Sequence, residues 1–157
     1  MDASKSKIYF NLFEDIIGQN SAIEILQSSL EKRKIAPAYL FTGPEGVGKK
    51  LTAIRFLEGI IKEKKPTIDI RKKLENRNHP DLMWIEPTYL NQGKMIEKSI
   101  ANKENINRKS IAKIRLEQIK EVKRFLGNKP IEADLGMIII EEVERMNESA
   151  SNALLKT

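Results

Sequence analysis

The sequence predicts an α/β protein with a parallel sheet and flanking helices, and three observations lead to this class. Apolar residues recur at helical spacing in several stretches, short apolar runs without that spacing separate them, and a glycine-rich turn lies between one such run and the next helix. The order along the chain is αβαβαβα, which is typical of a three-layer domain. We therefore expect parallel strands joined by right-handed crossovers.

Size and composition favour one domain or a part of one. The chain has 157 residues, of which 40% are hydrophobic and 32% are charged. It has no cysteine, so disulfides and thiolate metal sites are excluded and we expect no zinc. No apolar run is long enough for a signal peptide or a membrane span, so we expect a cytoplasmic protein without membrane contact. The net charge of +6 would attract polyanions such as DNA, although the lysine-rich stretches equally suit solvated helix faces.

The first helix and the first strand precede the glycine-rich turn. Three apolar residues recur at helical spacing in residues 20–32, and Ser21 with Glu24 matches a capping box at the start. Residues 38–42 (AYLFT) form a short apolar run, which is typical of a buried parallel strand. A second helix should begin near Gly48.

The remaining elements follow in alternation. Residues 70–74 suit a short amphipathic helix, and residues 81–86 (DLMWIE) suit a second strand. An apolar stripe predicts a helix over residues 116–127, which Gly127 would end in the left-handed conformation. Residues 136–140 (GMIII) suit a central parallel strand, and a helix should open within residues 149–157.

Two segments lack a regular pattern. Residues 89–113 are polar and rich in Asn and Lys, so we expect a long surface loop there. We also expect residues 1–12 to be disordered.

The clearest chemical signal is the segment GPEGVGKK, which fits the phosphate-binding motif G-x-x-x-x-G-K between a strand and a helix. In that setting backbone N–H groups surround phosphates, the helix N-terminus adds positive potential, and Lys49 reaches the terminal phosphates. The candidate phosphate-binding residues are Gly43, Pro44, Glu45, Gly46, Val47, Gly48, Lys49 and Lys50. A plain surface turn is the alternative interpretation.

The motif departs from its usual form at its eighth position. Lys50 stands where Ser or Thr would give Mg²⁺ a hydroxyl ligand, and an ammonium group cannot coordinate a cation. Thr52 has a hydroxyl, but two residues further along a helix it points about 200° away. We therefore expect this site to be poorly equipped for hydrolysis.

Two acids follow the predicted strand at residues 136–140, as the acidic pair of a nucleotide-hydrolysing strand would. In that interpretation Glu141 belongs to the Mg²⁺ shell and Glu142 is a catalytic residue that orients water. The alternative is that both are surface acids at the end of a strand.

Five segments together resemble the AAA+ clamp-loader family of bacterial DNA polymerase III, in its delta prime branch. They are FEDIIGQ (13–19), GPEGVGKK (43–50), HPDLMWIEP (79–87), IRLEQIKEV (114–122) and SNALLKT (151–157). The resemblance implies a P-loop ATPase fold of AAA+ type, incomplete at the C-terminus, with the helical lid and the collar domain absent from residues 1–157. It places Ile16, Ile17 and Gly18 near the adenine of ATP, Gly46, Gly48, Lys49, Lys50 and Leu51 along the phosphates, and Glu141 and Glu142 in the acidic motif.

The resemblance also implies a function and partners. A member of this family would join gamma or tau and delta subunits in a complex that loads the sliding clamp onto primed DNA, binding ATP with little hydrolysis of its own. Many relatives carry a four-cysteine zinc module, which this chain lacks, so no zinc role is carried over. Two alternatives stay open: a stand-alone AAA+ ATPase that acts on DNA, and a gene fragment that does not pack by itself.

Overall fold

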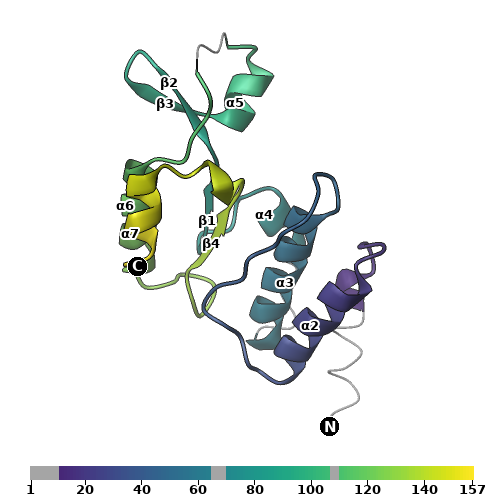
Figure 1. Cartoon of the computed structure of the whole chain (residues 1–157). Helices are drawn as coiled ribbons and strands as arrows, with labels where there is room; N and C mark the ends of the chain where they lie inside the picture. The colour runs from purple at the N-terminus through teal and green to yellow at the C-terminus, as the bar shows by residue number, and fades with distance from the viewer. Residues whose placement is uncertain (1–10, 65–69, 107–109) are drawn as a thin grey trace. The chain divides into compact units, whose positions relative to one another are not determined.

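The computed structural model describes residues 11–64, 70–106 and 110–157 (Figure 1). The chain forms two compact units, Met1–His79 and Pro80–Thr157. Each unit has its own helices, and the parallel strands belong to the second. The architecture is therefore α/β, with a small parallel sheet and flanking helices.

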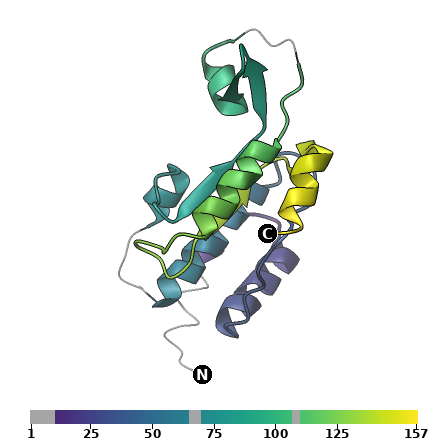
Figure 2. The same cartoon turned by 90° about the vertical axis from the view of Figure 1, so that its left-hand side faces the viewer.

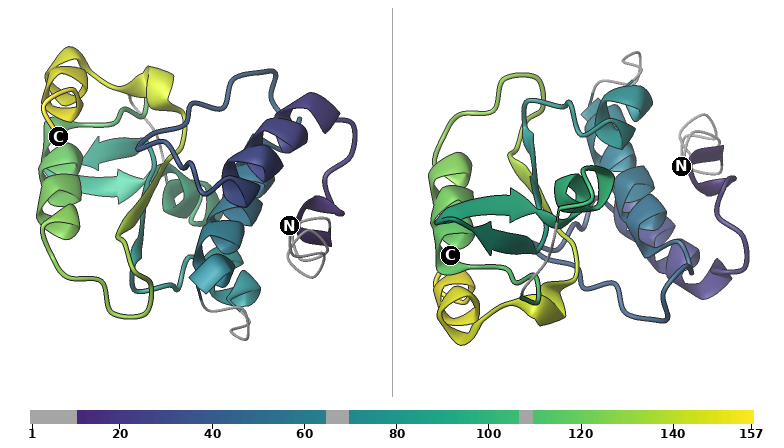
Figure 3. Two further views of the ribbon diagram at one scale, coloured as in Figure 1. Left: turned by 90° about the horizontal axis from the view of Figure 1, so that it is seen from below. Right: turned by 90° about the horizontal axis from the view of Figure 1, so that it is seen from above.

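The described part of the first unit is helical. It consists of the 3-10 helix η1 (Asn11–Phe13) and the α-helices α2 (Asn20–Glu31), α3 (Lys49–Lys64) and α4 (Arg71–Glu75). Helices α2 and α3 lie side by side, as both views in Figure 3 show. Their apolar faces enclose a core, because each helix repeats its large aliphatic residues at helical spacing. The buried members of this core are Leu12, Phe13, Ile16, Leu26, Leu30 and Phe56.

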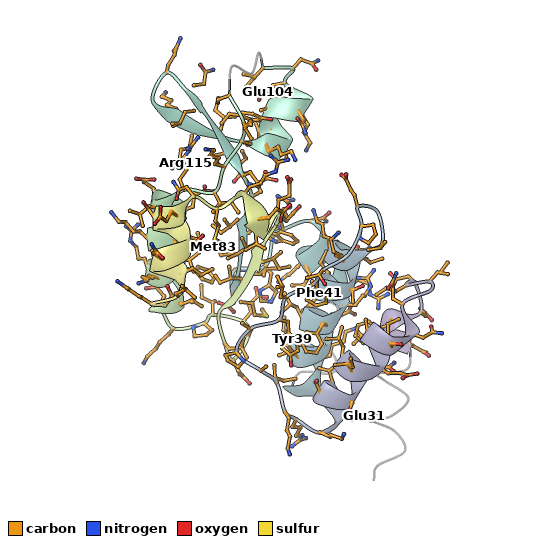
Figure 4. All side chains as sticks on the ribbon, viewed as in Figure 1. Glu31, Tyr39, Phe41, Met83, Glu104 and Arg115 are labelled. Atoms are coloured by element: carbon orange, nitrogen blue, oxygen red, sulfur yellow. The ribbon has the colours of Figure 1, made fainter. Side chains whose placement is uncertain are left out.

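The strand predicted at residues 38–42 is absent. These residues belong to no strand of the structure. Tyr39 and Phe41 pack against the core of the first unit (Figure 4). The rings of Tyr39 and Phe56 pack edge to face, and their centroids are 4.7 Å apart. Leu40 points the other way and is 72% exposed. Burial alternates as in a strand, but none of the described strands pairs with these residues.

The second unit contains the parallel pair of strands that the sequence predicts. Strands β1 (Leu82–Ile85) and β4 (Met137–Ile140) are parallel neighbours, with Met83 opposite Ile138 and Ile85 opposite Ile140. Helices α6 (Leu116–Leu126) and α7 (Glu148–Leu154) pack against the face that carries these residues. Asn147 caps α7, since its Oδ1 accepts from the Ala150 N–H at 2.8 Å. The 3-10 helix η2 (Val143–Arg145) links β4 to α7.

The expectation of a loop over residues 89–113 is wrong for most of that segment. A hairpin of β2 (Thr88–Asn91) and β3 (Lys94–Glu97) runs directly into helix α5 (Lys98–Lys103). The turn has Gln92 and Gly93 at φ of 48° and 78°, which matches the twist of a tight two-residue hairpin. Figure 2 shows the hairpin and α5 together at one end of the second unit. Residues 107–109 lie outside the described part.

Smaller differences concern the ends of elements. Helix α2 begins after Gln19 and has no side-chain cap, so the capping box of Ser21 and Glu24 does not form. Helix α6 ends at Gly127 as predicted, but with a φ of −76° instead of the left-handed conformation. Of the N-terminal segment expected to be disordered, residues 1–10 lie outside the described part, whereas Leu12 is buried in the core.

Candidate nucleotide-binding site

The glycine-rich loop of residues 43–50 adopts a conformation that requires glycine. The φ angles of Gly43, Gly46 and Gly48 are 139°, 83° and 87°, all in a region that side chains with a Cβ rarely adopt. A Cβ at Gly46 or Gly48 would meet nothing within 4 Å, so backbone conformation and not space demands glycine there. The loop turns the chain into α3, which begins at Lys49. The helix after the loop agrees with the motif, but the strand predicted before the loop does not form.

Two lysines lie where the loop meets α3, and one acid, Glu45, lies within the loop. The Lys49 ammonium folds back over it and donates to the carbonyl oxygens of Gly43 at 2.8 Å and Pro44 at 2.6 Å. The first turn of α3 contains no acid, and Lys50 is exposed next to Lys49. A helix N-terminus with two lysines and glycine-rich backbone suits a polyanion such as the phosphates of ATP.

The same residues do not fit Mg²⁺. Thr52 is 3% exposed, and its hydroxyl donates to the Gly48 carbonyl at 3.0 Å inside the helix. The side chain of Lys50 contains no oxygen atom that could bind the cation. Within residues 11–64, 70–106 and 110–157 no group of three or more His, Cys, Asp or Glu side chains could hold a metal ion. The donor set of the loop therefore matches phosphate without the usual metal ligand.

The segment before α2, which the resemblance places near the adenine, is anchored to α3. Ile16 is buried in the core, Ile17 is 91% exposed, and Gly18 has a φ of 77°. Arg55 of α3 donates to both carboxylate oxygens of Asp15, at 3.1 and 2.9 Å from its Nε. This hydrogen bond holds the pKa of Asp15 below its ordinary value. The exposed apolar side chain of Ile17 therefore lies two residues after Asp15, which Arg55 holds in place.

The two acids after β4 have different surroundings. The Glu141 N–H continues the ladder by donating to the Ile85 carbonyl at 2.9 Å. Glu142 has a left-handed backbone with a φ of 49°, and its carboxylate accepts from Lys98 at 2.6 and 2.8 Å and from Arg145. Burial raises the pKa of Glu142, but the hydrogen bonds from Lys98 and Arg145 outweigh burial and lower it. Glu142 is therefore held as a carboxylate by two cations.

Comparison with known families decides the relationship. The family model described as "DNA polymerase III, delta subunit" matches residues 18–157, which include the glycine-rich loop, both acids and the described elements from α2 onwards.

The chain belongs to this family.

Relatives within DNA polymerase III agree with that membership. The chain is 29% identical to the delta' subunit of Bacillus subtilis over 146 residues, which are 88% of this chain and 37% of the relative. It is 27% identical over 151 residues, 92% of this chain, to the tau subunit of Bacillus subtilis and to the tau/gamma subunit of Haemophilus influenzae. Those matches span 23% and 19% of the two relatives, so the chain covers about a fifth to two fifths of their lengths. No solved structure matches the chain significantly.

The remaining residues predicted for the phosphate site lie in the loop or in the first turn of α3. Pro44 and Glu45 are exposed in the loop, whereas Val47 and Leu51 are half-buried, and Leu51 packs against the core of the first unit. The loop belongs to the first unit and the acids belong to the second. Their joint role in one site stays a prediction. Among the described helices of this chain, none has the length and apolar character that a membrane span requires.

Several charged residues of the site regions were missed by sequence reasoning. Arg55 and Glu58 are buried in α3, and Glu58, which is fully buried, accepts from Lys62 at 2.7 Å and from Arg71 at 2.9 Å. Lys98 was assigned to a loop. One signal was available: a helix whose buried face contains Arg and Glu at i and i+3 predicts an ion pair inside the fold.

Proposed function

We propose that this chain is the nucleotide-binding part of a clamp-loader subunit of DNA polymerase III and that it binds ATP with little or no hydrolysis. The observation that carries the proposal is the glycine-rich loop at the start of α3, with Lys49 folded over it and Lys50 in the place of a metal-binding hydroxyl. Membership of the DNA polymerase III, delta subunit family supports the replication context.

The proposed fold is a three-layer P-loop ATPase domain of AAA+ type. The parallel pair β1 and β4, with α6 and α7 on one face, supplies a part of such a sheet. Glu141 and Glu142 follow the carboxyl end of β4, and in such sheets this is the edge where ligands bind.

The proposed partners follow from the family. The subunit would assemble with gamma or tau and delta subunits, and through that complex it would act on the sliding clamp and primed DNA. Binding without turnover suits a supporting subunit, because the bound nucleotide stabilises the fold while other subunits supply hydrolysis.

Nucleotide binding is tested with a fluorescent ATP analogue. We expect Lys49→Ala to weaken binding at least tenfold, about 1.4 kcal/mol, since it removes the cation that reaches the phosphates. Lys34→Ala is the matched control, because Lys34 is an exposed lysine of the same unit outside the loop. Equal binding by the wild type and Lys49→Ala would refute phosphate binding by this loop.

The metal dependence tests the role of Lys50. We expect removal of Mg²⁺ with EDTA to change the affinity for ATP by less than about threefold, because position 50 offers no oxygen ligand. Lys50→Thr should restore a clear dependence on Mg²⁺. A wild-type chain that binds ATP only with Mg²⁺ would contradict this part of the proposal.

The alternative, a stand-alone AAA+ ATPase acting on DNA, requires turnover. Steady-state phosphate release is measured with and without primed DNA. Robust release by the wild-type chain, lost in Glu142→Gln, would favour the alternative and overturn the proposal of a non-hydrolysing subunit.

A further inference from the structure

Residues 14–19, which we call the connector, join η1 to α2 without forming a helix or a strand. The side chain of Ile17 is 91% exposed, and Gly18 has a φ of 77°. The backbone N–H and C=O groups of Ile17 and Gly18 make no hydrogen bond with another described residue. The connector therefore presents an apolar side chain beside backbone donors and acceptors that its described neighbours leave unpaired, and this combination suits a flat purine base.

Two anchors on either side of the connector's second position hold it on the first unit. Ile16 is buried in the core, and its N–H donates to the Phe13 carbonyl at 3.0 Å. Asp15 is bound by α3, because the Nε of Arg55 donates to both of its carboxylate oxygens, at 3.1 and 2.9 Å. This hydrogen bond holds the pKa of Asp15 below its ordinary value, so the carboxylate stays charged at neutral pH. The position of the exposed Ile17 thus depends on the bond between Asp15 and Arg55.

The guanidinium of Arg55 is itself fixed. Its side chain is 4% exposed, and one terminal nitrogen donates to Glu75 Oε1 at 2.6 Å. The other terminal nitrogen lies 3.5 Å from the buried carboxylate of Glu58. Because a guanidinium is planar and rigid, bonds in several directions fix its orientation as well as its place. A lysine ammonium could supply the charge but not this oriented hold on Asp15.

The helix that holds the connector also begins at the glycine-rich loop. Helix α3 starts at Lys49, and Arg55 follows six residues later, about 9 Å along the helix axis. One helix therefore ties the position of the connector to that of the loop. A ligand with a phosphate end and a base end needs such a fixed spacing, because binding at one end promotes binding at the other only when both are within reach.

We propose that Asp15 and Arg55 are positioning residues for the purine base of the nucleotide: their ion pair holds the connector so that Ile17 packs on the base while the loop binds the phosphates. This inference rests on the proposed function, because it divides the same nucleotide site into a phosphate part and a base part. A connector that is ordered before binding loses little conformational entropy when the base binds. Loss of the ion pair should therefore weaken the base part alone.

The test compares ATP with tripolyphosphate, which has the phosphates but no base. Isothermal titration calorimetry measures both dissociation constants for the 157-residue chain, and we expect the wild type to bind ATP more tightly. Asp15→Ala should weaken ATP binding about five- to tenfold and change tripolyphosphate binding by less than about twofold. Glu14→Ala is the matched control, because it removes the exposed acid next to Asp15 and should leave the preference for ATP unchanged.

A second variant tests the oriented hold itself. Arg55→Lys keeps the cation but replaces the guanidinium by a point charge, so we expect about a threefold loss of ATP affinity with unchanged tripolyphosphate affinity. Circular dichroism at the titration temperature confirms that each variant is folded. If Arg55→Lys does not fold, Asp15→Ala decides, since Asp15 is 34% exposed and its removal leaves Arg55 paired with Glu75.

The outcomes separate this inference from the proposed function. Unchanged ATP affinity in Asp15→Ala would overturn the positioning role. An equal loss for ATP and tripolyphosphate would overturn it as well, because a general disturbance of the first unit affects both ligands. A wild type that binds tripolyphosphate as tightly as ATP would overturn the base part but leave phosphate binding by the loop in place. Failure of the wild type to bind either ligand would instead refute the proposed function, and the inference would fall with it.

Discussion

Replacing Arg55 by methionine removes the central cation of the first unit and tests how that unit is held together. The side chain of Arg55 is 4% exposed, and it links the segment before α2 to α3 and α4. Its Nε lies 2.9 Å from Asp15 Oδ2, and its second terminal nitrogen lies 2.6 Å from Glu75 Oε1. Burial lowers the pKa of Arg55, but the hydrogen bonds to Asp15 and Glu75 outweigh burial and raise it, so the cation is permanent.

The magnitude follows from what the substitution leaves behind. Removing one partner of a buried ion pair costs about 3 to 5 kcal/mol, because the other charge stays buried. Here Asp15 and Glu75 are 34% and 40% exposed and can be solvated again. Glu58 is fully buried but keeps Lys62 and Arg71 as partners. We therefore expect the lower end of the range, about 3 kcal/mol.

Urea denaturation followed by circular dichroism measures this loss. In thermal denaturation of a chain of this size, the same loss of about 3 kcal/mol would lower the Tm by about 6 to 12 °C. Lys72→Met is the matched control, because it removes an exposed cation from α4 and should change stability by less than about 0.5 kcal/mol. A loss below about 1 kcal/mol for Arg55→Met would mean that the network adds little, as for pairs at a surface.

Three further substitutions probe packing, buried hydrogen bonds and pH dependence by the same denaturation assay. Gly59→Ala adds a Cβ 2.7 Å from methyl groups of Leu12 and Leu30, so we expect a net loss of about 1 to 2 kcal/mol in spite of better helix propensity; a gain would show that the core relaxes. Asp81→Ala removes a buried carboxylate that accepts hydrogen bonds from the backbone N–H groups of residues 131–133, at 2.7, 2.7 and 2.6 Å. We expect the free energy of unfolding to fall by about 2 to 3 kcal/mol, and a fall of less than about 1 kcal/mol would contradict this role. The pKa of Asp15 is lowered in the folded chain, so its stabilisation is present above about pH 4 and is lost as the pH falls through the folded value. Asp15→Asn should therefore flatten the loss of stability between about pH 5 and 3, and an unchanged slope would contradict it.

The α-helices other than α5 and the parallel pair could be predicted because their signals are local or strongly apolar. Helix α2 lies within residues 20–32 and α6 within residues 116–127, where apolar residues repeat at helical spacing. Strands β1 and β4 are short apolar runs, and their direction follows from the helix between them. These elements need little knowledge of distant residues.

The first strand and the hairpin show where this reasoning stops. Residues 38–42 have the apolar alternation of a strand, but a strand also needs a partner, and no pattern within five residues identifies one. The hairpin carries polar residues on strands β2 and β3, so apolar content did not reveal it. A signal was nevertheless present: Gly93 after Gln92 suits a tight turn between two short segments.

In the candidate site too, features set by neighbouring residues could be predicted and contacts between distant residues could not. The glycine-dependent conformation of residues 43–50 could be predicted because it depends on eight consecutive residues, whereas phosphate binding by the loop stays a prediction. The contacts of Arg55 with Asp15 and of Lys98 with Glu142 join residues 40 and 44 positions apart. Such pairs depend on how the elements pack, which the charge pattern alone does not specify.

These distant contacts change what the local motif implies. Lys50 removes a metal ligand from the loop, whereas Lys98 neutralises Glu142, and the two lysines belong to different units of the chain. Restoring a metal ligand at position 50 leaves the ion pair of Glu142 in place, so the two features are tested by separate substitutions. Lys50→Thr alone should therefore give binding that depends on Mg²⁺ but little hydrolysis. Full turnover with that single substitution would mean that Glu142 is already available and that its ion pair is no obstacle.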